Sequence, residues 1–114
     1  MYYAGLQAGA QRLPFLPTRA GVGTSYPDIN PALKLFTDPI CGEPLIAVPA
    51  IRPDITFLYV GYSDAFGNAQ HVGTGYGDRS LYRASVETIV CAERIVSNEA
   101  IRSDFSKTSI PGAT

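Results

Sequence analysis

The sequence contains no tryptophan, a single histidine and only two cysteines among 114 residues. Cys41 and Cys91 lie fifty positions apart and form no C-x-x-C pair, and with only His71 beside them they lack the spacing of a zinc site. We therefore predict no metal centre. Each cysteine borders an apolar segment, where a free thiol is usually a small buried hydrophobic group, so we expect both to be buried. A disulfide between them is left open by the sequence.

Neither sign of charge dominates, because nine Lys and Arg residues face ten Asp and Glu residues for a net charge of −1. This balance excludes the basic surface that nucleic acids and anionic membranes require. The longest apolar runs, "PLIAVPAI" and "ITFLYVG", have eight and seven residues. A bilayer span needs roughly 20 residues. The N-terminus also lacks the basic and apolar pattern of a secretory signal. We expect a cytoplasmic protein with no nucleic-acid or membrane partner.

The hydrophobic content of 46%, with 17% charged residues, is that of a folded globular protein, and the length suits a single domain. The strongest element is "PDITFLYVGYS" (53–63), which is apolar on both alternating faces from Ile55 to Val60. A strand buried on both faces belongs to a sheet that helices cover on both sides. The sequence therefore predicts an α/β fold with a mostly parallel or mixed sheet flanked by helices.

Apolar periodicity and turn residues indicate the remaining elements. Helices are predicted over 2–12 and 78–87, with Asp78 as N-cap, and a helical turn is expected after Ser97 or Asn98. Further strands are predicted over 13–17, 45–51, 69–73 and 88–96. Residues 18–38 read as a loop with one helical turn at 32–36, and residues 105–114 as a disordered tail.

The long loop is the best candidate for a site, because loops beyond about 12 to 15 residues in a compact domain are often functional. It holds Arg19 beside "AGVGTS", with Gly21 and Gly23. A fixed cation next to exposed backbone amides can bind a phosphate or a carboxylate. This loop is predicted to attract anions.

A second glycine-rich stretch, "GTGYGD" (73–78), lies twenty positions before Glu93 and nearly matches a dinucleotide-binding pattern. Its third glycine comes one residue early, and Asp78 would place negative charge where a pyrophosphate should lie. A plain glycine turn is the favoured interpretation, with nucleotide binding as an alternative.

His71 is the only imidazole available to a Ser-His-Asp arrangement, and no G-x-S-x-G motif accompanies it. A partly exposed polar role is favoured for this histidine. Glu43 and Asp64 stand beside turns near strand ends, where reacting groups are often mounted. Carboxylates at glycine turns more commonly accept hydrogen bonds from the turn itself.

Three ordered motifs give the chain a resemblance to a known family. They are "PTRAGVGT" (17–24), "GEPLIAVPA" (42–50) and "PDITFLYVGYSDAFGN" (53–68). Over about residues 5–100 the chain resembles the first (A, or alpha) subunits of family I coenzyme A transferases, and is most similar to the glutaconate-type branch. That branch includes a steroid-ring-opening hydrolase acting on CoA thioesters. The resemblance covers only the later half of subunits more than twice this length, so we expect a partial domain over 1–114.

The resemblance implies an acyl-CoA:carboxylate CoA-transferase in which a glutamate carries CoA as a thioester through two half-reactions. It implies a second (beta) subunit, a hetero-oligomer, and CoA thioesters and carboxylates as substrates, with no tightly bound cofactor. The attacking glutamate is expected outside this chain, so the isolated chain is expected to be inactive and no catalytic residue is assigned. The glutamates left unassigned are Glu43, Glu87, Glu93 and Glu99.

Carried over by motif, the residues expected to line the acyl or CoA pocket are Arg19, Ala20, Gly21, Val22, Gly23 and Thr24. The turn residues Asp64, Gly67 and Asn68 are expected to shape the wall of the same site. Two alternatives remain at this stage: part of a CoA-thioester ring-opening hydrolase, and a nonenzymatic binding or assembly module of the same fold.

Overall fold

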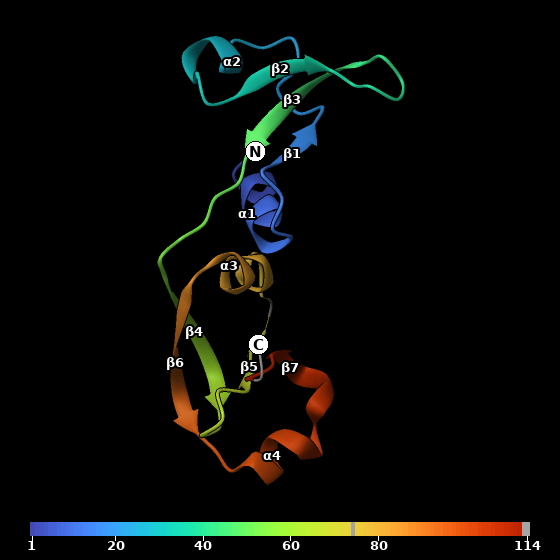
Figure 1. Cartoon of the computed structure of the whole chain (residues 1–114). Coiled ribbons are helices and arrows are strands. Elements are labelled where there is room, and N and C mark those ends of the chain that lie inside the picture. Colours follow the sequence, from blue (N-terminus) through green and yellow to red (C-terminus); the bar gives the residue numbers. More distant parts are fainter. Residues whose placement is uncertain (74, 113–114) are drawn as a thin grey trace.

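The computed structural model describes residues 1–73 and 75–112 as an elongated mixed α/β chain, with extents of 52 × 25 × 23 Å (Figure 1). The helices are α1 (Tyr2–Ala10), α2 (Tyr26–Ile29), α3 (Asp78–Ala84), α4 (Asn98–Ser103) and the 3₁₀ helix η1 (Phe105–Lys107). The strands are β1 (Phe15–Thr18), β2 (Lys34–Thr37), β3 (Pro44–Pro49), β4 (Ile55–Ser63), β5 (Ala69–Gln70), β6 (Glu87–Ile95) and β7 (Thr108–Ile110). The mixed α/β class predicted from the sequence is confirmed.

One sheet is antiparallel and has the strand order β1-β3-β2. Pro49 ends β3 early, as its missing amide hydrogen predicts. The prediction of a loop over 18–38 with a helical turn at 32–36 is wrong, because α2 and β2 form there instead. Tertiary contacts override the local pattern: Lys34–Thr37 pairs with β3, and Leu33 is buried against Ile46 and Val48.

The second sheet is mixed and has the order β6-β4-β5-β7. Strands β4 and β6 run parallel, in a register from Ile55↔Glu87 to Ser63↔Ile95, whereas β5 is antiparallel to both β4 and β7. Its core contains Leu58, Val60, Ala69, Tyr82 and Ile110. Helix α1 lies between the two sheets and packs against α3 and β1 (Figure 1).

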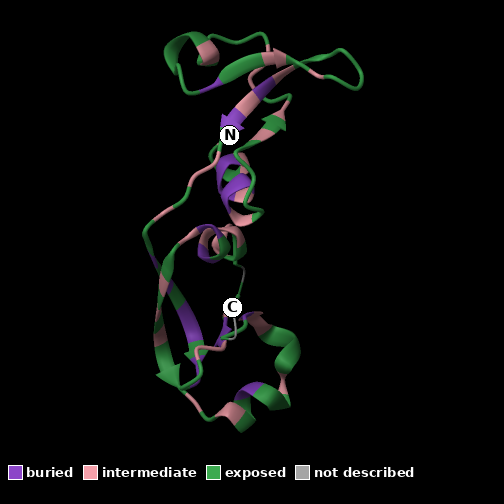
Figure 2. Cartoon of the chain, in the orientation of Figure 1, coloured by how far each residue is buried: buried purple, intermediate pink, exposed green. Residues whose placement is uncertain are grey.

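The expectation that strand 53–63 is covered on both faces is wrong for this chain. Burial alternates along β4: Leu58 and Val60 are buried, whereas Phe57 and Tyr59 are 69% and 65% exposed (Figure 2). The buried side chains face α3, and no element of the described chain covers the other face. The apolar character of that face is therefore unexplained by contacts within the described residues.

The prediction of a disordered tail over 105–114 is wrong for its first part. Phe105–Lys107 forms η1 and Thr108–Ile110 forms β7, which pairs with β5. Ile110 is 4% exposed because it completes the core of the second sheet. Residues 113–114 of the predicted tail lie outside the described residues, as does Thr74 in the glycine stretch.

Both cysteines are free and exposed, which corrects the prediction that they are buried. Cys41 lies in the turn between β2 and β3, whose amides bond the Asp38 carboxylate, and Cys91 lies on the uncovered face of β6. Within the described residues, no helix has the length and apolar character to cross a bilayer.

Candidate functional site

The loop Arg19–Thr24 consists of two successive tight turns at the end of β1. The amide of Val22 donates to the Arg19 carbonyl at 3.2 Å, and the amide of Thr24 donates to the Gly21 carbonyl at 3.1 Å. Gly21 and Gly23 have φ angles of +86° and +80°, a left-handed region in which glycine carries no steric cost. The glycines are therefore required by the fold of the loop itself.

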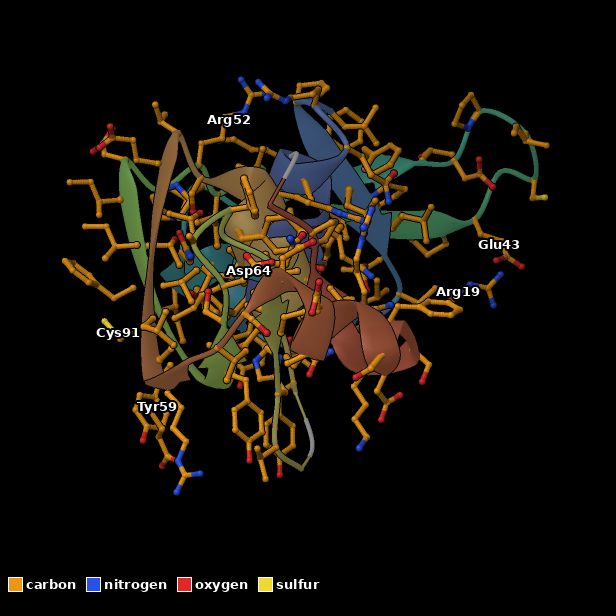
Figure 3. All side chains as sticks on the ribbon, turned by 90° about the horizontal axis from the view of Figure 1, so that it is seen from below. Arg19, Glu43, Arg52, Tyr59, Asp64 and Cys91 are labelled. Carbon is orange, nitrogen blue, oxygen red and sulfur yellow. The ribbon has the colours of Figure 1, made fainter. Side chains whose placement is uncertain are left out.

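The predicted cation of this loop is paired. The guanidinium of Arg19 donates to the carboxylate of Glu43, which the β2–β3 turn brings alongside, and the two side chains are 76% and 48% exposed (Figure 3). In the described chain, the amides of Gly21 and Gly23 donate to no protein atom. The loop thus offers two free backbone donors beside a pair of opposite charges, which is the composition of an anion-binding surface.

A second carboxylate lies close to this ion pair. The amides of Ile40 and Cys41 donate to Asp38 at 3.0 and 3.1 Å and, together with the nearby Arg19 charge, lower the pKa of this carboxyl against the opposing effect of burial. The turn that carries Glu43 is therefore held in shape by an ionised Asp38 at neutral pH.

The predicted turn at Asp64 closes on itself through hydrogen bonds. The Asp64 carboxylate accepts from the amides of Phe66 and Asn68 at 3.0 Å, and from the side-chain amides of Asn68 and Asn98 at 2.8 Å. Burial alone would raise its pKa, but these donors outweigh burial and hold the pKa below its usual range. Gly67 has a φ of +83° and allows the reversal.

The structure does not bring the two predicted groups together within this chain. The loop Arg19–Thr24 extends from the β1-β3-β2 sheet, and the Asp64 turn lies at the far end of β4 in the other sheet (Figure 1). Loop residues line none of the cavities found in the described residues, whereas Gly67 borders the largest. A shared site therefore needs further polypeptide around this chain.

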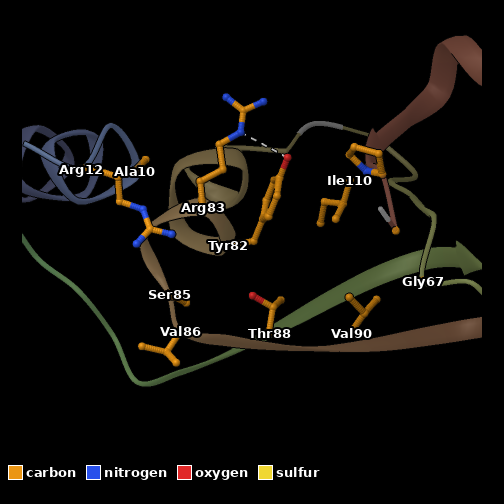
Figure 4. Close-up of a pocket in the computed structure, with 12 residues that line it drawn as sticks. Ala10, Arg12, Gly67, Tyr82, Arg83, Ser85, Val86, Thr88, Val90 and Ile110 are labelled. Carbon is orange, nitrogen blue, oxygen red and sulfur yellow. Dashed lines mark hydrogen bonds between the residues drawn. The ribbon is translucent and has the colours of Figure 1, made fainter. Parts of the chain in front are cut away.

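That largest cavity has a volume of about 510 Å³ and lies between α3 and β6 (Figure 4). Tyr82 and Arg83 of α3 face Thr88 and Val90 of β6 across it, and Arg12 borders it from the end of α1. Its walls come from the helix and the sheet face that form the core, so it is a gap in that core, open to solvent.

His71 does meet a serine and an aspartate. Its Nε2 lies 2.6 Å from Asp78 Oδ2, and its Nδ1 is hydrogen-bonded to Ser109 Oγ. Ser109 lies within β7 and not at a strand-to-helix turn, so the arrangement ties α3 and β7 to the residue after β5. Asp78 was predicted as the N-cap of the helix 78–87, but it is the first residue of α3, Gly77 is the cap, and the helix ends at Ala84.

The dinucleotide alternative is contradicted by the topology around residues 73–78. Strand β5 is antiparallel to β4, and β6 pairs with β4 instead of β5, so α3 does not connect two neighbouring parallel strands. Glu93, the acid of that pattern, accepts a hydrogen bond of 2.5 Å from the Tyr59 hydroxyl, which raises the pKa of Tyr59. The favoured glycine turn is the better description.

Comparison with known proteins decides the family. The coenzyme A transferase family model matches residues 1–114, the whole chain. The chain belongs to the coenzyme A transferase family. Its resemblance to the alpha-type subunits of family I, first indicated by the motifs at 17–24, 42–50 and 53–68, is confirmed.

Relatives are matched over only part of their length. The chain is 41% identical over 108 residues to the cholesterol ring-cleaving hydrolase IpdA subunit of Mycobacterium tuberculosis, covering 89% of this chain and 37% of that protein. It is 37% identical over 91 residues to the A subunit of the 3-oxoadipate CoA-transferase of Pseudomonas knackmussii, covering 80% of this chain and 32% of that protein. The crystal structure of glutaconate coenzyme A-transferase from Acidaminococcus fermentans superimposes with a TM-score of 0.88 at 28% identity, over 98% of this chain and 40% of that chain.

Proposed function

We propose that this chain is part of the alpha subunit of an acyl-CoA:carboxylate CoA-transferase. The observation that carries the proposal is the family match over the entire chain, together with a relative named as the first of the subunits of a CoA-transferase. Partners of the proposed enzyme are a second subunit, in a hetero-oligomer of the cytoplasm, and its substrates are an acyl-CoA and a carboxylate. No tightly bound cofactor is part of the proposal.

The proposed chemistry uses a glutamate that this chain does not supply. Its carboxylate attacks the carbonyl carbon of the acyl-CoA and expels the CoA thiolate, which leaves a mixed anhydride. The thiolate then attacks the glutamyl carbonyl, releases the first carboxylate and forms the glutamyl thioester. The same two steps in reverse load the second acid, so that one difficult exchange becomes two easier ones.

The loop Arg19–Thr24 is proposed to contact the thioester substrate. Its exposed glycine turns and free amides would face the carbonyl or phosphate oxygens of the substrate, and Arg19 adds a positive charge beside them. The turn of Asp64, Gly67 and Asn68 is proposed to shape the wall of the site through the position in which it holds the end of β4. This part of the proposal requires the second polypeptide to bridge the distance between them.

A second candidate function is hydrolytic ring opening of a CoA thioester. It is favoured by the 41% identity to a relative named as a ring-cleaving hydrolase subunit. The two reactions differ in their second substrate: transfer needs a carboxylate acceptor, whereas ring hydrolysis adds water and leaves the thioester in place. Product analysis with and without acetate separates them.

The proposal is tested by an Arg19→Ala variant assayed for CoA transfer from an acyl-CoA to acetate, with the complementary polypeptides added. We expect turnover to fall about tenfold or more through loss of a charge-assisted contact to substrate. The thermal midpoint should change little, because exposed ion pairs contribute little to stability.

Lys107→Ala is the matched control, since Lys107 also forms an exposed ion pair, with Asp104 at 2.8 Å. This variant should retain full turnover. Equal turnover in both variants would reject the loop as a substrate contact. Transfer activity in the isolated chain would reject the proposal that the nucleophile lies elsewhere, and a stable but inactive complex would favour the nonenzymatic assembly module.

A further inference from the structure

The parallel pair β4/β6 presents an uncovered apolar face. It is formed by Ile55, Phe57, Tyr59, Ile89 and Cys91, which we call the open face. The first four are 50%, 69%, 65% and 43% exposed, and Cys91 is exposed as well. The register places Phe57 opposite Ile89 and Tyr59 opposite Cys91, so these side chains form one continuous surface. Figure 3 shows Tyr59 and Cys91 pointing away from the body of the molecule, on the side opposite Arg19.

A bare face is unusual for strands that run parallel. Parallel sheets occur almost only where both faces are covered, and their strands read as near-continuous apolar runs. On β4 the covered side chains, Leu58 and Val60, and the uncovered ones, Phe57 and Tyr59, are equally apolar. Contiguous apolar surface of this kind marks an interaction site on a folded protein.

The edge of β6 is uncovered as well. In the described chain, this nine-residue strand pairs with β4 on one side and with no strand on the other. A long free edge is a template for adding a strand. On the face opposite the open face, Thr88 and Val90 of the same strand line the cavity of about 510 Å³. Within the described residues, β6 is thus open at its edge and incompletely packed on both faces.

The comparison with the solved transferase indicates what covers them. The backbone of this chain superimposes with a TM-score of 0.88 on the Acidaminococcus fermentans structure, yet this chain covers only 40% of that chain. The elements of this chain are therefore arranged as in a larger fold, while the open face, the β6 edge and the cavity all surround one strand.

We propose that the open face, the β6 edge and the cavity together seat the remainder of the alpha-subunit fold, a polypeptide that adds a strand beside β6 and packs apolar side chains on both of its faces. This inference rests on the proposed function. Glu87 and Glu93 stand at the two ends of the open face on β6, so the covering segment is expected to carry Lys or Arg at the rim of an apolar centre.

The two free cysteines provide the test, because Cys91 lies in the open face and Cys41 lies in the distant β2–β3 turn. The probe is the Mycobacterium tuberculosis IpdA polypeptide without its matched region, expressed separately and mixed with the full chain. Alkylation of each cysteine by a maleimide is followed by mass spectrometry. We expect the rate at Cys91 to fall about tenfold or more in the complex, since alkylation requires access, while the rate at Cys41 is unchanged.

A pair of exposed phenylalanines supplies a matched control. Phe57→Glu should abolish co-elution of the two polypeptides on a sizing column, whereas Phe105→Glu, at a site 77% exposed on η1, should not. Circular dichroism of each free variant checks that the chain still folds. Equal co-elution of both variants would overturn the inference.

The other outcomes are distinct. A complex in which Cys91 keeps its free rate would overturn this inference and leave the proposed function standing. Absence of any complex would contradict both. Protection of Cys91 that rises with the concentration of the chain alone, with a doubled mass, would identify a second copy as the occupant and overturn the inference.

Discussion

Replacing Asp64 by alanine is expected to lower the free energy of unfolding by about 3 kcal/mol, because it removes a buried charged acceptor that serves several donors. Asp64 is 5% exposed and accepts four hydrogen bonds, two from backbone amides and two from the side chains of Asn68 and Asn98. Urea unfolding followed by tyrosine fluorescence measures the loss. Asp104→Ala, which removes an exposed carboxylate, is the control and should change stability far less.

The same carboxylate predicts a pH dependence. Its pKa is lowered in the folded chain, whereas in the unfolded chain it titrates near pH 3.9, the value of a free aspartate. Below about pH 4 the unfolded state therefore binds more protons than the folded state, and stability falls as the pH falls. Asp64→Asn removes this contribution and should show a shallower acid loss. Identical acid profiles for the two proteins would contradict the role of the Asp64 charge.

Replacing Gly9 by alanine is expected to destabilise the chain by about 2 kcal/mol, in the range of overpacked sites. Helix propensity alone predicts the opposite sign, a gain of about 1 kcal/mol. A Cβ at Gly9 would lie 2.2 Å from the Ile51 carbonyl oxygen and 3.1 Å from the Ala84 Cβ, so α1 would have to move away from both. The close approach of α1 to the 49–51 segment and to α3 requires a glycine there.

Gly5→Ala provides the comparison on the same helix. A Cβ at Gly5 would lie 2.8 Å from Ile51 Cδ1, the end of a flexible side chain, and so should cost less than the backbone contact at Gly9. Thermal unfolding of the two variants gives the order. Gly9→Ala equal to or more stable than the unmodified chain would show that propensity outweighs the contact.

The elements that local pattern predicts well are those whose residues decide their own conformation. The strand 53–63, the helix starting at Tyr2 and the turn after Ser97, where the Ser97 hydroxyl accepts from the Ala100 amide at 3.2 Å, were all predictable. The glycines of α1 were interpreted as a weakness of the helix. Only the structure shows the contact that makes Gly9 necessary, because Ile51 and Ala84 are distant in sequence.

The elements missed depend on partners far away in the chain. Strand β2 forms because β3 is beside it, and β7 forms because β5 is, which the residues at 34–37 and 108–110 do not reveal by themselves. For the site, the chemistry of the Arg19–Thr24 loop was readable from its glycines, but its pairing with Glu43 was not. Ser109 and Asn98 were missed for the same reason: each meets its partner across the fold.

The open face shows the limit of reasoning from apolar pattern. The run Ile55–Val60 correctly indicates a strand, but its apolar residues on both faces predict a cover that one face lacks among the described residues. Pattern records what a strand is suited to contact, whatever polypeptide supplies the contact.

The central claim is that this chain shapes a CoA-transferase site whose attacking carboxylate comes from another polypeptide. The direct measurement is mass spectrometry of digested protein after the chain and its complementary polypeptides are incubated together with an acyl-CoA. The account predicts a covalent CoA adduct on a complementary polypeptide and unmodified Glu43, Glu87, Glu93 and Glu99 in this chain. An adduct on any of these four glutamates would contradict it.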